Sequence, residues 1–138
     1  RVELLYSNPE SPPDEAGLEL YCGRCHAAKI HFASIILNEG RVPSTSDAAG
    51  HAGMVLGLIE VLREELFPIS KTDLLTLAYE HLTKLKLLLS DVPKPLLAAY
   101  LPLVIAEPFL KRFEKGYTSQ QAEPASWHIL WRMMRGSI

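Results

Sequence analysis

The chain has 138 residues, a formal net charge of −2 and 48% apolar residues, which is typical of a folded domain and argues against disorder. This length allows one domain to bury a real core without metal ions or disulfides. A net charge near zero does not favour binding to nucleic acid. The apolar run over residues 101–106 falls far short of the roughly 20 residues that span a bilayer. We therefore expect no nucleic acid partner and no membrane span.

The chain is predicted to begin with an extended arm over residues 1–13, where a short apolar piece runs into prolines, and to continue as one helical domain over residues 14–138. The first predicted helix starts with two acidic residues, Asp14 and Glu15, and ends at Gly40. Its apolar residues recur every three or four positions, so we expect them to form one buried face. They are Leu18, Tyr21, Cys22, Cys25, Ala28, Phe32, Ile35 and Ile36.

A second helix is predicted to begin between residues 46 and 49 and to end near Leu66. Gly50, Gly53 and Gly57 weaken it by roughly 1 kcal/mol each relative to alanine. Because they lie three and four residues apart, they form a strip of small residues that another helix could approach closely. If the strip is exposed, it would instead be a docking or self-association face.

The stretch from Ser70 to Asp91 is rich in leucine, and we expect it to be the central helix of the fold. Its apolar stripe is wider than a surface helix needs, which predicts neighbours on several sides. Ser70 and Asp73 are suited to capping its first turn. Pro93 ends the pattern, because the residue before a proline is pushed out of helical geometry.

Prolines punctuate the chain after this helix. We expect a short helical turn over residues 96–101 and a helix over residues 103–115, with a kink at Pro102 or Pro108. Pro124 is predicted to open a last helix. No strand-period alternation is sustained. The fold class is therefore predicted as all-α, either a single-domain bundle of four to six helices or a short helical-repeat (solenoid) segment.

The only two cysteines lie in the run CGRCH, residues 22–26. Cys22 and Cys25 have the spacing that takes the two vinyl groups of a haem, with His26 in reach of the iron. Over these five residues the run resembles the haem-attachment motif of small c-type cytochromes, which implies a helical haem c protein that transfers electrons or senses a gas. The alternative, which we favour, is that both cysteines pack as small hydrophobic residues and that no cofactor is bound.

Other chemistry has less support. A structural zinc site needs four thiolate or imidazole ligands, and the two cysteines with one nearby histidine supply three. A redox dithiol favours a helix N-terminus that follows a strand. Arg24 and His31 fit the loose Arg-x(4–6)-His spacing of some all-helical ribonuclease domains. None of these forms a full catalytic set, so we do not expect an enzyme.

The last predicted helix carries two tryptophans one turn apart and two arginines. Tryptophan and arginine are enriched in interface hot spots, so this helix is the predicted partner-binding surface, together with a basic pair near residue 111. The predicted partner-binding residues are Trp127, Trp131, Arg132, Arg135, Lys111 and Arg112. We expect an intracellular scaffolding or interaction domain, cytoplasmic or nuclear, from a larger protein. Its partner would be another protein or a helical peptide, with a homo-oligomer as a further option.

Overall fold

The computed structural model describes residues 15–64, 69–122 and 126–135, and the regular structure in these ranges is helical, which confirms the predicted all-α fold. The predicted arm, residues 1–13, lies outside the described residues. The elements, in chain order, are α1 (Glu15–Cys22), a π-helical turn η1 (Gly23–Ala27), α2 (Ala28–Leu37), α3 (Ser46–Glu64), α4 (Lys71–Leu89), a 3₁₀ helix η2 (Lys94–Ile105), α5 (Ala106–Glu114), α6 (Ser119–Ala122) and α7 (Ser126–Met134).

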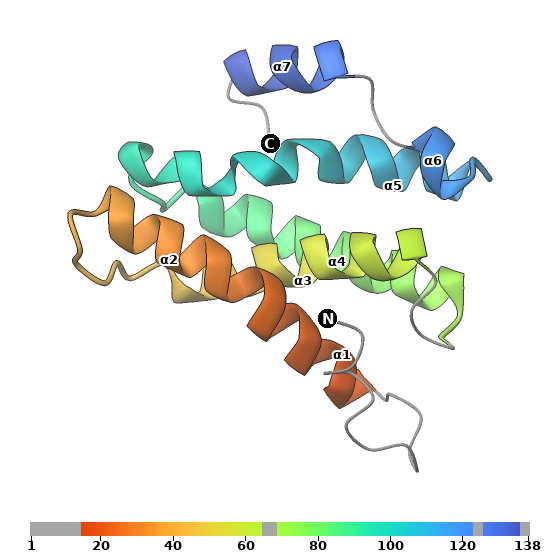
Figure 1. The fold of residues 1–138 in the computed structure, drawn as a ribbon, viewed down its shortest axis with the longest axis horizontal. Coiled ribbons are helices and arrows are strands. Elements are labelled where there is room, and N and C mark those ends of the chain that lie inside the picture. Colours follow the sequence, from red (N-terminus) through yellow and green to blue (C-terminus); the bar gives the residue numbers. More distant parts are fainter. Residues whose placement is uncertain (1–14, 65–68, 123–125, 136–138) are drawn as a thin grey trace.

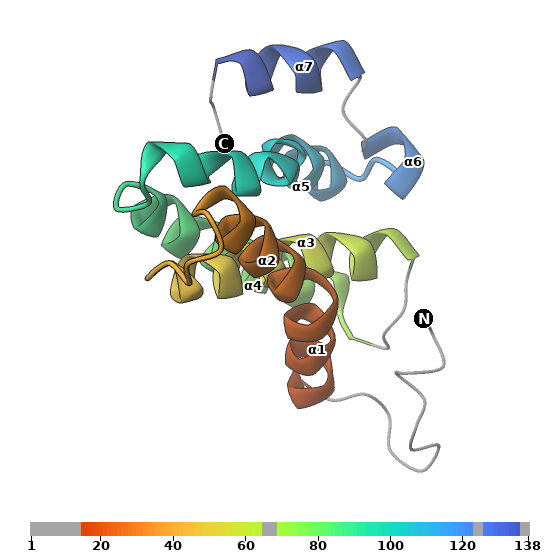
Figure 2. The same cartoon turned by 60° about the vertical axis from the view of Figure 1, so that its left-hand side comes forward.

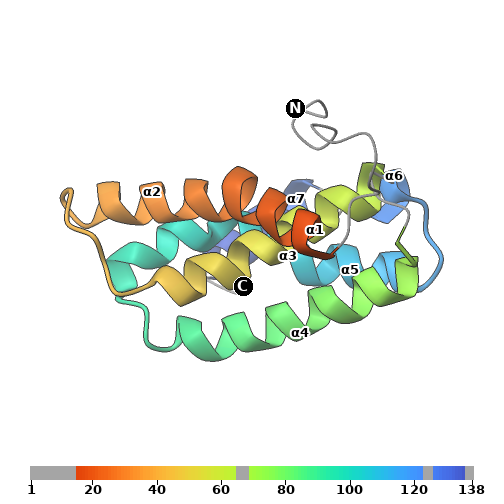
Figure 3. The same cartoon turned by 90° about the horizontal axis from the view of Figure 1, so that it is seen from below.

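Helix α3 lies at the centre of the fold (Figure 1). It contacts α1, η1, α2, α4, η2, α5 and α6, and more than half of its 19 residues are buried. Seen from below, it runs between α4 and the continuous rod formed by α1, η1 and α2 (Figure 3). In a solenoid each unit would touch only its neighbours, so this packing around one helix is that of a bundle.

Helix α4 is an outer helix, so the prediction that it forms the centre of the fold is wrong. It buries Leu74, Ala78, Leu82 and Leu85, one stripe that faces α3. Leu87 on its other side is 71% exposed. The number of leucines in α4 is therefore a poor guide to how much of the helix is buried. The glycines of α3 allow closer packing, and it is α3 that the other helices surround.

The π-helical turn η1 changes which residues of the first helix face the core. The backbone is helical at both ends of η1, so α1, η1 and α2 form one rod. Buried Leu18, Cys22, Ile30 and Ser34, with half-buried His26 between them, recur every four positions. In a straight α-helix such a series would drift by about 160° around the axis. A π turn contains one residue more than an α-helical turn, and this residue reduces the drift by about 100°.

This change of register exposes two residues that the sequence pattern placed in the core. Phe32 is 63% exposed and Ile36 is 76% exposed, while Ile30 is 3% exposed. Cys25, Ala28 and Ile35 are only half-buried. The predicted buried face is therefore correct before the π turn, at Leu18, Tyr21 and Cys22, and wrong after it at Phe32 and Ile36. The reason is that the prediction assumed an uninterrupted period of 3.6 residues.

The rod crosses α3 at its glycines. A Cβ atom at Gly53 would collide with the backbone of Ala27, and one at Gly57 would collide with the Cys22 thiol. A Cβ atom at Gly50 would meet nothing within 4 Å. The predicted close approach of a second helix is thus confirmed at two of the three glycines, and these two are buried inside the domain rather than displayed as a docking face.

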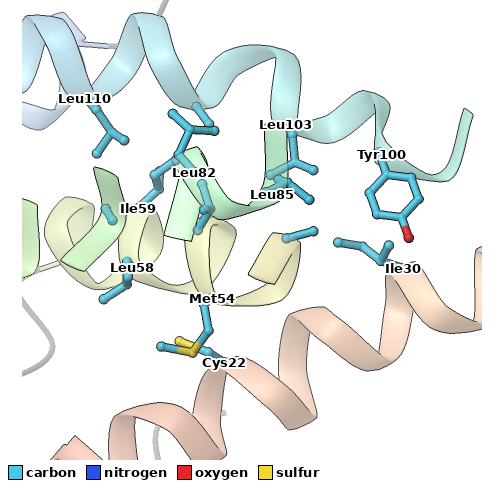
Figure 4. Packing of buried hydrophobic residues seen from close by; sticks show 14 of the residues in the cluster. Cys22, Ile30, Met54, Leu58, Ile59, Leu82, Leu85, Tyr100, Leu103 and Leu110 are labelled. Atoms are coloured by element: carbon cyan, nitrogen blue, oxygen red, sulfur yellow. The ribbon is translucent and has the colours of Figure 1, made fainter. Parts of the chain in front are cut away.

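Helices η2 and α5 follow one another directly and cover the other side of α3 (Figures 1 and 2). The sequence pattern predicts two segments that meet at Pro102, with a kink there or at Pro108. The boundary at Pro102 is wrong, because the 3₁₀ helix continues through this exposed residue, and Pro108 lies in the first turn of α5. Gly116, at φ +85°, follows α5. Tyr100 of η2 lies close to Ile30 of α2 in the core (Figure 4). Within the described ranges, no helix combines the length and the apolar character needed to cross a bilayer.

Candidate functional site

Helix α7 displays large apolar side chains on the outside of the domain. It packs on η2 and stands outside the η2–α5 layer (Figure 2). Leu130, Met133 and Met134 are exposed and spaced so that they lie on one strip, with exposed Trp131 beside them. Trp131 is 50% exposed and Met134 86%. These four residues, here called the α7 face, are large apolar side chains exposed together on one helix.

Arginine lies at the edge of this patch. The Arg135 guanidinium is 3.9 Å from the centre of the Trp131 ring. A cation–π contact at an exposed site contributes about 0.5–1 kcal/mol, and it holds the indole and the charge side by side. The structure thus brings together two of the predicted partner-binding residues. The side chains of Trp127 and Arg132 lie outside what the structure describes.

The positive charge of the predicted basic pair on α5 is partly neutralised by a neighbouring glutamate. Lys111 Nζ donates to Glu107 at 2.6 Å, and Lys86 Nζ on α4 donates to the other carboxylate oxygen at 2.7 Å. The hydrogen bonds from Lys111 and Lys86 lower the pKa of Glu107 to about 2. Arg112 is half-buried on the same helix. Because Glu107 cancels one of the two lysine charges, this face offers an acidic partner only a modest attraction.

A glutamate that the sequence analysis did not single out ties the first rod to α3. The Tyr21 hydroxyl and His26 Nε2 both bond to the same carboxylate oxygen of Glu60, at 2.7 and 2.6 Å. A carboxylate only accepts hydrogen bonds, so both groups act as donors. Burial, and then the bond to Glu60, raises the pKa of Tyr21 well above its ordinary value. The π turn positions His26 for this contact, and the bond to Glu60 engages the Nε2 atom of the imidazole ring.

The CGRCH run does not fit a covalently attached haem in this arrangement. Cys22 is fully buried, and its thiol points toward α3 beside Met54 (Figure 4). A thioether bond there would require α3 and the first rod to separate at Gly57. The nearby His26 is bonded to Glu60 instead of being free for an iron. Cys25 is half-buried, and both cysteines are free thiols.

The two thiols are expected to differ sharply in reactivity. Burial, and then the neighbouring Cys25, raises the pKa of Cys22 to about 12. Because the thiolate is the nucleophile, we expect iodoacetamide at pH 8 to label native Cys22 at least about a hundredfold more slowly than Cys25. Peptide mass spectrometry measures both rates. In 6 M urea the two rates should converge, and equal rates in the native protein would contradict the buried position of Cys22.

His51 and His81 are a second polar pair that the sequence analysis did not predict as a site. Their Nδ1 atoms are 2.8 Å apart, between α3 and α4. One signal could have found these residues and Glu60. Each is a polar residue within an apolar helical stripe, and a buried polar group must find a partner. The sequence does not indicate which two helical stripes face each other, so these pairings could not be predicted from it.

Comparisons of the chain with protein-family models, with curated proteins and with solved structures found no match. The geometry of the described residues is therefore what bears on function.

Proposed function

We propose that this chain is a protein-interaction domain that binds its partner through the α7 face. The observation that carries the proposal is the exposure of Leu130, Trp131, Met133 and Met134 on one helix. Most of the large apolar side chains in the described part of the chain are buried around α3, so this patch is not needed to complete the core. A partner that covered it would remove apolar surface from water, which contributes about 25 cal/mol per Å².

The residue types of the α7 face suit recognition of another helix. Tryptophan is enriched among hot-spot residues, and methionine adapts its shape to different partners. An amphipathic helix could lay its apolar stripe against the patch. Arg135 at the edge favours a partner with an acidic residue beside that stripe. The proposal is therefore for a binding protein, not an enzyme, whose partner is another protein or a helical peptide.

The exposed α2 residues Phe32 and Ile36 offer a smaller apolar strip on a different helix. We assign the main contact to α7 because it joins four apolar residues, one of them a tryptophan, to an adjacent arginine. Lys111 and Arg112 stay in the proposal as a secondary basic surface. The free thiols Cys22 and Cys25 are consistent with a reducing compartment, so we propose an intracellular location.

The test is a binding measurement with matched substitutions. Once a binding protein has been captured and identified, Trp131→Ala and Met134→Ala should each weaken binding about tenfold or more, as expected for hot-spot residues. Leu87→Ala is the control, because Leu87 is a similarly exposed apolar residue on α4. Both classes of variant should keep the thermal stability of the parent chain.

Two results would overturn the proposal. One is unchanged affinity in Trp131→Ala and Met134→Ala. The other is an equal loss of affinity in Leu87→Ala, because the partner would then recognise exposed apolar residues without regard to position. Light scattering of the purified chain tests whether it self-associates. If the partner is a second copy, the Trp131→Ala and Met134→Ala variants should be monomeric.

A further inference from the structure

Two imidazoles from different helices meet on the wall of an open cavity. His51 of α3 and His81 of α4 lie with their Nδ1 atoms 2.8 Å apart and their ring centres 4.9 Å apart. The cavity beside them has a volume of about 500 Å³. The carboxylate residues Glu19 and Asp47 also line it, together with Met54. The pair is thus accessible to a small ion, and the carboxylates make the cavity attractive to a cation.

The geometry points to a site for a divalent transition-metal ion, Cu²⁺ above all, held by His51 and His81. With metal–imidazole bonds of about 2.0 Å, two adjacent ligands of a square-planar ion lie about 2.8 Å apart, and two ligands of a tetrahedral ion about 3.3 Å apart. The observed Nδ1–Nδ1 distance of 2.8 Å is that of the hydrogen bond between the two rings, and it lies within about 0.5 Å of both values, so a small rotation of the side chains would let one ion bind both nitrogens. Cu²⁺ is also the strongest binder of nitrogen ligands among the divalent first-row ions.

Binding requires a small change in the two side chains. Without metal, one Nδ1–H donates to the other Nδ1. To bind an ion, both Nδ1 lone pairs must turn toward the position of the ion. With bonds of about 2.0 Å and an N–metal–N angle of about 90°, this position lies about 1.4 Å from the line that joins the two nitrogens. The donor ring then carries its proton on Nε2, exchanged through solvent, so two neutral imidazoles bind the ion with no net release of protons. The χ2 torsion of histidine is soft enough for such a rotation.

The protein supplies two ligands, and solvent supplies the rest. Among the described residues, no group of three or more His, Cys, Asp and Glu side chains is arranged to hold a metal ion. Water would therefore complete the coordination on the cavity side, where Glu19 and Asp47 lie within the same lining. Lys84 places a positive charge near His81 and opposes a cation, while Glu80 and Glu19 favour it. This is a site for reversible binding, which would link α3 to α4 when occupied.

The experiment titrates Cu²⁺ into the full chain, with glycine as a competing ligand, and records electron paramagnetic resonance spectra. We expect one tetragonal Cu²⁺ per chain whose hyperfine pattern shows two imidazole nitrogens. His51→Gln and His81→Gln should each lower the affinity by about tenfold or more, because even residues outside the ligand shell change metal affinity 10–100-fold. His31→Gln is the control, since His31 is also half-buried but lies on α2.

A thiol can also react with copper, so every arm is repeated in the Cys25→Ser background. The inference is overturned if copper binding is unchanged in His51→Gln and His81→Gln, or if it disappears with Cys25→Ser. Circular dichroism shows whether the glutamine variants are folded. If they are not, the spectrum of the unaltered chain decides, because fewer than two imidazole nitrogens would contradict the site. A chain with 100-fold excess of Cu²⁺ over Kd should also melt about 5–10 °C higher.

Discussion

Gly53→Ala is expected to destabilise the fold by about 2 kcal/mol, although alanine is the better helix former. The added Cβ would collide with the backbone of Ala27, where the π turn crosses α3. Backbone atoms cannot rotate away as a flexible side chain can, so the two helices must separate. Overpacking of a tight core costs about 1–3 kcal/mol, and a collision with backbone belongs at the upper end of this range. Subtracting the gain of roughly 1 kcal/mol in helix propensity leaves a net loss of about 2 kcal/mol. Urea unfolding followed by circular dichroism measures the difference.

Gly50→Ala is the matched control for this experiment. Gly50 lies on the same helix and gains the same propensity, but its new Cβ would meet nothing within 4 Å. We expect this variant to be more stable than the parent chain by about 0.5–1 kcal/mol. The two alanine variants should therefore differ by about 3 kcal/mol. Equal stability of the two would mean that the first rod does not cross α3 at Gly53.

Ile30→Ala is expected to lower the free energy of unfolding by about 2–4 kcal/mol, whereas Phe32→Ala should lower it by less than about 1 kcal/mol. Ile30 is 3% exposed and faces Tyr100 in the core, so its truncation leaves a cavity (Figure 4). Phe32 is 63% exposed and has little packing to lose. Chemical denaturation of both variants, compared at one temperature, checks the order.

This pair of variants tests the register that the π turn imposes. A continuous α-helical period places Phe32 on the buried face of the first helix and therefore predicts the reverse order of effects. A larger loss for Phe32→Ala would show that the rod follows the simple 3.6-residue period after Ala27. Far-UV circular dichroism before unfolding confirms that both variants retain their helices.

The helical fold could be predicted from the sequence because its signals are local. Apolar residues recur at helical spacing, and glycine and proline mark the ends of segments. The predicted start of the second long helix, between residues 46 and 49, agrees with α3 at Ser46, and Ser70 does precede α4. Ser70 makes no side-chain capping bond, however, so its predicted role is only partly correct.

The arrangement of the helices could not be predicted in the same way, because it depends on contacts between distant segments. Leucine content favoured α4 as the centre, but small residues at Gly53 and Gly57 allow the first rod to lie closer to α3. The π turn is a second example. One additional residue in a helical turn leaves almost no mark in composition, yet it moves Phe32 and Ile36 from the core to the surface.

The candidate site was predictable only in part. Trp131 and Arg135 were singled out by residue type, and the structure places them in contact on an exposed helix. Leu130, Met133 and Met134 were not, because periodicity alone does not tell which face of a short amphipathic helix is covered. The pairing of Glu60 with Tyr21 and His26 joins residues more than 30 positions apart, so no local pattern reveals it.

Site-specific photocrosslinking from the α7 face tests the proposed interface most directly. A photoreactive amino acid replaces Met134 in one variant and Leu87 in another, both in the full chain inside its host cell. The α7 proposal predicts a discrete crosslinked partner, or a crosslinked second copy, from position 134 and none from position 87. Equal crosslinking from the two positions, or a partner captured only from position 87, would contradict it.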